Sequence, residues 1–152
     1  MTVVEYCQEE VSRQGHDITQ LDGIQRTAWM LDGWVYALKE SEKVRYPNVY
    51  DVIAIGQFVE PEKNRKGLRS CGVRVGSRVC PSPERVSGLL AKVFLDIVTQ
   101  PPLDFYRAYE IVHPFVDGNG RVGKILLAWG SRSLLEPKFP PNDFWGTIIR
   151  NP

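Results

Sequence analysis

The chain has 152 residues, which suits one domain with one sizeable hydrophobic core, and we expect a single domain over residues 1–152. Its formal net charge is +1 and its basic residues look scattered, so composition gives no case for binding nucleic acid or a membrane surface. The three cysteines lack metal-ligand spacing, and no signal peptide or long apolar run opens the sequence. We therefore expect structural thiols rather than disulfides and a cytoplasmic location, with delivery to another cell as an alternative.

The first third of the sequence predicts three helices. Gly15 is a stop signal after a short N-terminal helix whose apolar residues are Val3, Val4, Cys7 and Val11. Asp17 and Gln20 form a capping-box pattern ahead of a long helix, whose expected buried stripe is Ile18, Leu21, Ile24, Ala28, Leu31, Val35 and Leu38. Trp29 and Trp34 are interpreted as core residues. Asn48 then caps a third helix.

The middle of the sequence predicts a loop and a strand, and three more helices follow. Residues 60–66 have loop composition, and the spacing changes to a strand period over residues 69–75. Ser82 and Pro83 begin a helix that extends to Val98, and residues 103–112 form the next one. A last helix carries Val122, Ile125, Leu126, Trp129 and Ser133 on one face. In the tail, Phe139, Phe144 and Trp145 are expected to pack against the body.

Residues 113–124, His-Pro-Phe-Val-Asp-Gly-Asn-Gly-Arg-Val-Gly-Lys, lie between the last two predicted helices. The run Gly118-Asn119-Gly120 can turn backbone N–H groups inward where the second helix presents its unpaired amides, which makes an anion site. The Asn119 side chain is expected to add an amide donor. Arg121 and Lys124 share a helix face and are expected to reach further phosphate oxygens.

Two residues of this loop predict catalytic chemistry. Asp117 supplies a hard oxygen ligand for Mg²⁺. His113 ends the preceding helix, where the negative end of the helix dipole is expected to favour a proton on the imidazole. These properties suit a metal ligand and a general base. A structural turn is the alternative for each residue taken alone, whereas the combination favours a phosphate site.

The pattern His-Pro-Phe-x-Asp-Gly-Asn-Gly-Arg resembles the signature of Fic-domain proteins, which usually carry a second Arg three residues later, where this chain has Lys124. The resemblance extends over roughly residues 17–135, because Gly67-Leu68-Arg69 and Val73-Arg74-Val75-Gly76 look like the flap hairpin of the family. It implies a mainly α domain, a Fic-like helical fold with a short β-hairpin flap over the active site. Independently of the resemblance, Phe115 is expected to turn inward as an anchor.

As the resemblance implies, we expect a protein adenylyltransferase that moves AMP from ATP to a Ser, Thr or Tyr hydroxyl of a target protein, with ATP and Mg²⁺ as cofactors. His113 would be the base, and Asp117 would hold the metal. Gly118, Asn119, Gly120, Arg121 and Lys124 would bind phosphates. The flap would bind the extended main chain of the target through Ser70, Cys71, Gly72, Val73, Arg74 and Val75; a purely structural ribbon is the alternative.

Two alternatives remain open. A protein kinase like the related Doc toxins is disfavoured, because their motif resembles Asn-Lys-Arg rather than Gly-Asn-Gly-Arg. A partner-binding module with weakened catalysis is favoured by Lys124. Many Fic proteins are restrained by a helix with the pattern Ser/Thr-x-x-x-Glu-Gly/Asn, whose Glu engages the second Arg. This sequence has no such match, so the expectation is restraint by a separate inhibitory protein or no restraint.

Overall fold

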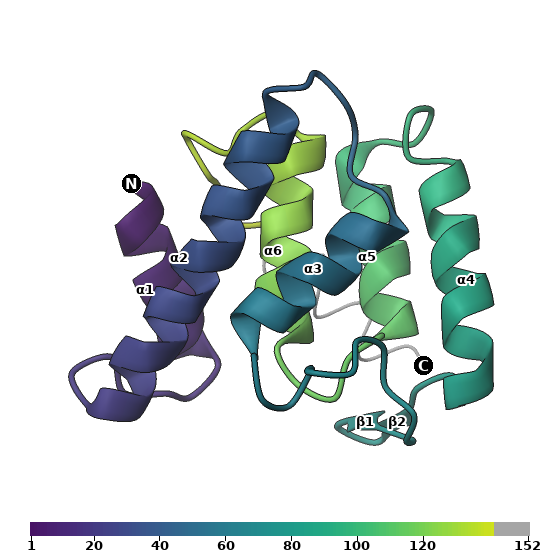
Figure 1. The fold of residues 1–152 in the computed structure, drawn as a ribbon, viewed down its shortest axis with the longest axis horizontal. Coiled ribbons are helices and arrows are strands. Elements are labelled where there is room, and N and C mark those ends of the chain that lie inside the picture. The colour runs from purple at the N-terminus through teal and green to yellow at the C-terminus, as the bar shows by residue number, and fades with distance from the viewer. Residues whose placement is uncertain (142–152) are drawn as a thin grey trace.

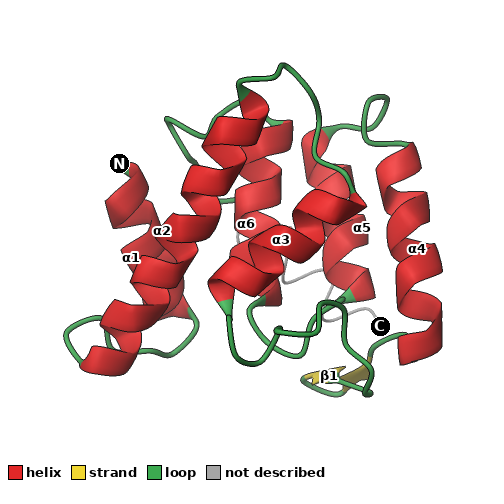
Figure 2. Ribbon diagram, in the orientation of Figure 1, coloured by secondary structure: helices red, strands yellow, loops and turns green. Residues whose placement is uncertain are grey.

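Six helices and one two-stranded antiparallel sheet make up residues 1–141, the part of the chain that the computed structural model describes (Figure 1). Their bounds are α1 Val3–Arg13, α2 Leu21–Ser41, α3 Val49–Val59, β1 Arg74–Val75, β2 Arg78–Val79, α4 Pro83–Leu95, α5 Pro102–Val112 and α6 Asn119–Gly130. The structure confirms the predicted class, a mainly helical fold with a short β-hairpin (Figure 2).

The last helix, α6, is the centre of the fold, because it packs against α1, α2, α3 and α5. Figure 1 shows α2 and α3 in front of α5 and α6, with α1 and α4 on the two sides. Every residue of α6 from Arg121 to Trp129 is buried, including two charged ones. A helix enclosed in this way has no solvent face for its polar side chains, so each of them must find a partner inside the protein.

Two helices begin as their sequences predict. Thr2 and Glu5 cap α1 reciprocally, and Asn48 and Asp51 do the same for α3. Each pair satisfies two backbone N–H groups that would otherwise lack acceptors at the helix start. The predicted N-terminal and third helices are therefore confirmed.

The long helix α2 differs from its predicted form in start and in face. Asp17 accepts hydrogen bonds from the Thr19 backbone N–H and hydroxyl, so it closes a turn and the helix begins only at Leu21. The predicted stripe is wrong for Leu21, Ile24, Ala28 and Val35, which are exposed, whereas Ile18, Leu31 and Leu38 are half-buried and pack against the core. The buried face instead carries Gly23, Thr27, Met30, Gly33, Trp34 and Ala37. Its small residues let α2 approach α3 and α6 closely. Trp34 is core, as predicted, whereas Trp29 is only half-buried.

Several boundaries in the second half also move. The predicted strand over residues 69–75 shrinks to β1, which pairs with β2 in the register Arg74 opposite Val79 and Val75 opposite Arg78. Helix α4 ends at Leu95, which leaves Val98 exposed. Helix α6 begins at Asn119, inside the motif, and ends before Ser133.

The predicted packing of the tail is confirmed where the structure describes it. The Phe139 ring stacks on Tyr6 with 4.1 Å between ring centroids. Phe144 and Trp145 lie outside the described residues. Among the helices of residues 1–141, none combines the length and the apolar character that crossing a membrane requires.

Candidate active site

The loop between α5 and α6 is anchored to α3 by Phe115 and Asn64. The Phe115 ring is fully buried and lies on the backbone of Gly56, where an added Cβ would be 2.3 Å from the ring. The Asn64 side-chain amide donates to the carbonyl oxygens of Gly56 and Asp117, at 3.1 and 2.9 Å. Phe115 therefore turns inward as predicted, and the loop has one position relative to α3.

The predicted anion cradle forms at the start of α6. Gly118 has φ of +79°, a left-handed conformation that glycine adopts readily, and α6 begins at the next residue. Within residues 1–141, the backbone N–H groups of Asn119, Gly120 and Arg121 have no hydrogen-bond acceptor. These amides and the positive end of the helix dipole attract an anion.

The Asn119 side chain has a different task from the predicted one. Its Oδ1 accepts from the Phe115 N–H and its Nδ2 donates to the Phe115 carbonyl, both at 2.9 Å. Both ends of the amide are therefore used inside the loop, and the side chain is buried. Asn119 holds the shape of the cradle, whereas the expected extra amide donor toward a phosphate is not available in this arrangement.

The imidazole of His113 is neutral at physiological pH, contrary to the expectation from the helix dipole. His113 caps α5 with φ of +51° and is half-buried. Burial of the imidazole and then the positive charge of Arg69 lower the pKa of His113 to about 4. Its Nδ1 has no hydrogen-bond partner among the described residues. A neutral imidazole beside an anion cradle can accept a proton from a hydroxyl group.

Arg69, for which no separate role was predicted, is a buried cation that ties His113 to the flap. Its guanidinium donates to the carbonyl oxygens of His113 (2.7 Å), Val112 (3.2 Å), Cys71 (2.9 Å) and Pro81 (2.7 Å). Its backbone N–H donates to the Pro114 carbonyl at 2.9 Å. One side chain thus fixes the C-terminal end of α5 and both ends of the hairpin.

Replacing Arg69 with Met is expected to raise the pKa of His113, because the variant loses the nearest positive charge. The sequence has two histidines, so an NMR titration of the imidazole signals can follow His113 with the His16 signal as an internal control. Arg69→Lys keeps the charge and should leave the pKa of His113 low. An unchanged pKa in folded Arg69→Met would assign the low value to burial alone.

Asp117 is ionised and partly exposed, as a magnesium ligand must be. Burial opposes its ionisation, but hydrogen bonds from the Lys63 ammonium and the Gly118 N–H outweigh it and lower the pKa of Asp117. The Lys63 Nζ lies 2.7 Å from Asp117 Oδ2. No group of three or more metal-binding side chains occurs within residues 1–141. The single carboxylate fits Mg²⁺ that takes its other ligands from phosphates and water, provided that Lys63 moves aside.

Arg121 forms an internal ion pair rather than pointing into solvent. It is 1% exposed and donates to Glu60 Oε1 at 2.8 Å and to the Val59 carbonyl at 3.4 Å. Arg26 also donates to Glu60. Glu60 therefore lies between two arginines, and binding of a phosphate by Arg121 requires exchange of this partner.

Lys124 is also paired, and its partner was not predicted. Its Nζ lies 3.2 Å from Glu10 Oε1 on α1, a residue that is 2% exposed. The Gln14 amide donates to the same oxygen at 3.0 Å and lies over the cradle, where a Cβ on Gly120 would be 2.7 Å from Gln14 Nε2. The end of α1 therefore covers the cradle. The sequence gave no sign of this contact, because Tyr6 and Val11 stand where the inhibitory pattern requires Ser or Thr before its Glu and Gly or Asn after it.

A second carboxyl group contributes to the surroundings of Lys124. Glu110 on α5 is fully enclosed, and its burial raises the pKa of its carboxyl to about 8, although the charge of Lys124 opposes the rise. Its Oε1 has no hydrogen-bond partner in the described part of the chain. Glu110 is therefore mainly protonated at neutral pH, and Lys124 is paired with Glu10.

The predicted flap residues divide into a loop and a strand. Ser70, Cys71 and Gly72 are exposed loop residues, Val73 is half-buried, and only Arg74 and Val75 belong to β1. The Cys80 N–H donates to the Val73 carbonyl at 3.1 Å, which extends the pairing by one bond. Cys7, Cys71 and Cys80 are free thiols. The hairpin is held near His113 by Arg69.

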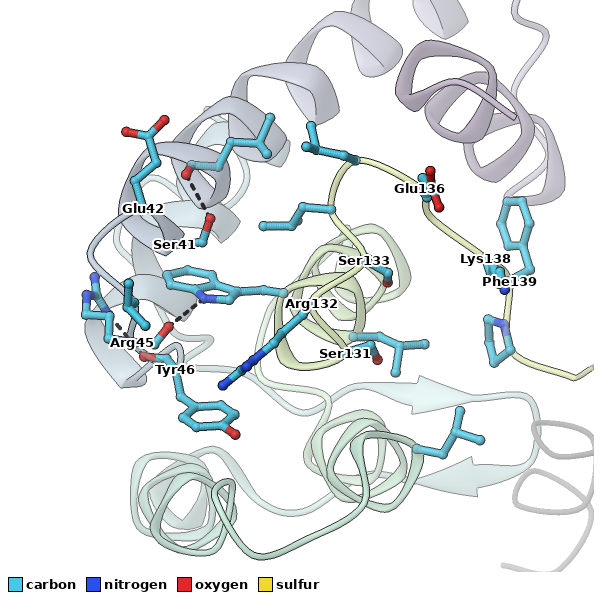
Figure 3. Close-up of a pocket in the computed structure, with 18 of the residues that line it drawn as sticks. Ser41, Glu42, Arg45, Tyr46, Ser131, Arg132, Ser133, Glu136, Lys138 and Phe139 are labelled. Atoms are coloured by element: carbon cyan, nitrogen blue, oxygen red, sulfur yellow. Dashed lines mark hydrogen bonds between the residues drawn. The ribbon is translucent and has the colours of Figure 1, made fainter.

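One cavity in the described part of the chain lies away from this loop. It measures about 1110 Å³ and is lined by the C-terminal ends of α2 and α6 and by residues 131–141. Figure 3 shows Arg45, Tyr46 and Arg132 around it. An α-helix rises about 1.5 Å per residue, so the two ends of α6 are roughly 17 Å apart. A phosphate bound at the start of α6 would therefore lie outside this cavity. None of the predicted site residues lines the cavity.

Comparisons with known proteins agree on one family. The family model described as Fic/DOC family matches residues 46–129, more than half of the chain. A protein of Aquifex aeolicus named "Probable protein adenylyltransferase" is 34% identical over 71 residues, which cover 41% of this chain and 22% of that protein. A crystal structure of a Fic family protein from Desulfovibrio desulfuricans superposes with a TM-score of 0.60 at 21% identity, covering 85% of this chain and 44% of the other. The chain thus spans less than half the length of these relatives.

Proposed function

Because this chain belongs to the Fic/DOC family, we propose that it transfers AMP from ATP to a hydroxyl side chain of another protein. The observation that carries this proposal is the neutral His113 imidazole at the end of α5, in the loop that also forms the amide cradle of α6. The adenylyltransferase name of the Aquifex relative supports the choice of AMP as the group transferred.

In the proposed reaction, the target hydroxyl oxygen attacks the α-phosphorus of ATP. The bond between the α-phosphorus and the bridging oxygen breaks, and pyrophosphate leaves with that oxygen. His113 accepts the hydroxyl proton, and the N–H groups of the cradle stabilise the negative charge that develops on the α-phosphate. Asp117 would hold Mg²⁺, which would neutralise phosphate charge. Lys124 would bind the leaving pyrophosphate once Glu10 releases it.

Label transfer tests the proposal directly. Incubation of the protein and candidate targets with α-labelled ATP is expected to label a target, whereas γ-labelled ATP should leave it unlabelled. Mass spectrometry should find a Ser, Thr or Tyr that has gained the mass of AMP. Transfer of the γ-label instead would identify a kinase of the Doc type, and labelling from neither nucleotide would contradict the proposal.

A partner-binding module with weakened catalysis is the second candidate, and a specific observation favours it. Both cations of the motif, Arg121 and Lys124, already hold buried carboxylates. Thermal unfolding with and without ATP and Mg²⁺ separates the candidates, because a ligand that binds the native state raises its stability. An unchanged melting temperature at saturating nucleotide, together with no label transfer, would favour the binding module.

Replacing Glu10 with Gln is expected to tighten ATP binding by about tenfold, because it frees the Lys124 ammonium from a competing carboxylate. Lys124→Ala should weaken ATP binding, and Lys124→Arg should tighten it through a planar, bidentate donor. Calorimetry measures each affinity. Glu9→Gln is the matched control, since Glu9 lies on the same helix but is exposed and pairs with Arg13.

Equal ATP affinity in the Glu10 and Glu9 variants would remove Glu10 from the site. Restraint by a separate protein, or no restraint, was the expectation from the sequence, and Glu10 is a further candidate within this chain. A higher transfer rate in Glu10→Gln than in the Glu9 control would favour this internal restraint over the other two.

A further inference from the structure

The flap and the loop before it carry a concentrated positive charge. Residues 63–83 contain six of the 19 basic residues of the chain and none of its 18 acidic residues. The remaining sequence therefore has 13 basic and 18 acidic residues. The expectation that the basic residues are scattered is wrong for this segment, because the net charge of +1 conceals a positive segment on a negative protein. The six residues are Lys63, Arg65, Lys66, Arg69, Arg74 and Arg78.

Apart from the buried Arg69, these cations reach solvent, and most of them have no carboxylate partner in the part of the chain that the structure describes. Lys63, Arg65, Lys66 and Arg74 are exposed, and Arg78 is half-buried. Within the described residues, Lys63 is the one member of the set with a carboxylate partner, Asp117. Elsewhere in the fold, by contrast, carboxylates pair with Arg13, Arg26, Lys43, Arg45, Arg121 and Lys124. The protein thus neutralises many of its other cations but leaves this face positive.

The positive face adjoins the candidate active site. Two contacts hold residues 63–69 against the loop that carries His113. The Arg69 backbone N–H donates a hydrogen bond to the Pro114 carbonyl, and the Lys63 ammonium pairs with Asp117. Figure 2 shows the hairpin at the same end of the helical body as the α5–α6 connection. A hollow of about 180 Å³ lies beside this loop, lined by Val116 and by residues 62, 63 and 65–70. Four of its lining residues are cationic and one, Glu62, is acidic, so the hollow has a net positive lining.

The chemistry of the face favours a polypeptide over a nucleic acid. The hairpin has only two strands in the described structure, so each strand has a free edge whose backbone groups can pair with an added strand. Residues 63–83 contain no Phe, Tyr or Trp, the side chains on which unpaired bases stack. A nucleic-acid backbone cannot continue the hydrogen bonds of a sheet, whereas an extended peptide can.

We propose that this face, residues 63–79, selects targets that present an extended acidic segment beside the hydroxyl to be modified. The inference rests on the proposed function for the role of that hydroxyl, but binding of the acidic segment can be measured without any transfer. Since the cations are exposed, the attraction is expected to weaken as salt screens them.

The experiment uses a labelled peptide of about ten residues, long enough to cross the hairpin, with Glu alternating with Val around one Ser. A second peptide has Gln in place of every Glu. Fluorescence anisotropy is expected to show binding of the Glu peptide that weakens between roughly 0.01 and 0.15 M salt, as the Debye length falls from about 30 to 8 Å. The Gln peptide should bind at least about tenfold more weakly.

Paired charge reversals locate the surface. Arg65→Glu with Arg74→Glu should lower affinity for the Glu peptide by at least about tenfold, whereas Lys39→Glu with Lys92→Glu, which makes the same change in net charge on α2 and α4, should not. All four residues are exposed. Arg65→Gln with Arg74→Gln should give an intermediate loss, and circular dichroism checks that each variant is folded. ATP affinity should be the same in all of them.

Each other outcome is decisive. Equal losses in the two charge-reversed pairs, or equal binding of the Glu and Gln peptides, would overturn the proposal. Tighter binding of a single-stranded oligonucleotide of similar length and charge would assign the face to nucleic acid instead. If the Glu peptide binds as expected but neither peptide accepts AMP, the proposed function is wrong and the acidic-segment binding surface is supported. If both peptides accept AMP equally well, the proposed function is supported and the selection of acidic segments is wrong.

Discussion

Replacing His113 with Ala is expected to lower AMP transfer by roughly 10²-fold to 10⁴-fold, the usual effect of losing a general base. ATP affinity and stability should change little, because the imidazole makes no ion pair and its Nδ1 has no partner within residues 1–141. Initial rates with a fixed target measure the loss, and calorimetry measures ATP affinity. His16→Ala is the control, since His16 pairs with Asp22 near the start of α2.

The pH dependence of transfer follows from the same residue. A base works in its deprotonated form, and the pKa of His113 is lowered to about 4, mainly by burial. Transfer should therefore be insensitive to protonation of His113 near neutral pH and fall as the pH drops through about 4. An ordinary histidine would lose activity below about 6.5. A rate that halves near pH 6.5, or full activity in His113→Ala, would contradict the assignment.

Replacing Glu60 with Ala is expected to destabilise the protein by roughly 3–5 kcal/mol, because the buried Arg121 guanidinium loses its hydrogen-bonded carboxylate and keeps only Asp117, at 3.7 Å. Urea unfolding measures the change. Glu62→Ala, at an exposed position two residues away, should stay within about 0.5 kcal/mol of the parent chain.

A double variant separates charge from packing. Glu60→Leu with Arg121→Met removes both buried charges and should recover part of the stability that Glu60→Ala loses. If Glu60→Ala is instead as stable as Glu62→Ala, the Glu60–Arg121 pair is not a structural requirement. Arg121 would then be free to bind phosphate, as the sequence suggested.

The sequence predicted those parts of the fold and site that depend on neighbouring residues. The Asn48 cap, the helix that ends at His113 and the glycine turn at Gly118 are set by local geometry, so periodicity and turn chemistry were enough to predict them. The inward turn of Phe115 agrees as well.

The rest depends on contacts between distant parts of the chain. The partner of Lys124 lies 114 residues away, and the carbonyl that fixes Arg69 to His113 lies 44 residues away. No pattern within one helix could reveal either contact. The expected proton on His113 was wrong because the helix dipole is a smaller effect than burial and the charge of Arg69. Most of the buried face of α2 was missed because four of its six residues, Gly23, Thr27, Gly33 and Ala37, are small and give no strong apolar pattern.

The Gly56–Phe115 contact has a consequence for protein design. The motif loop has its shape only because α3 offers a bare backbone for the Phe115 ring and because Asn64 joins that backbone to the Asp117 carbonyl. A transplant of residues 113–124 onto another pair of helices would bring the reactive groups without the contacts that fix the shape of the loop. The smallest portable unit therefore comprises two pieces of chain, the loop with its flanking helices and the stretch from Gly56 to Arg69, and a designer would have to move both together.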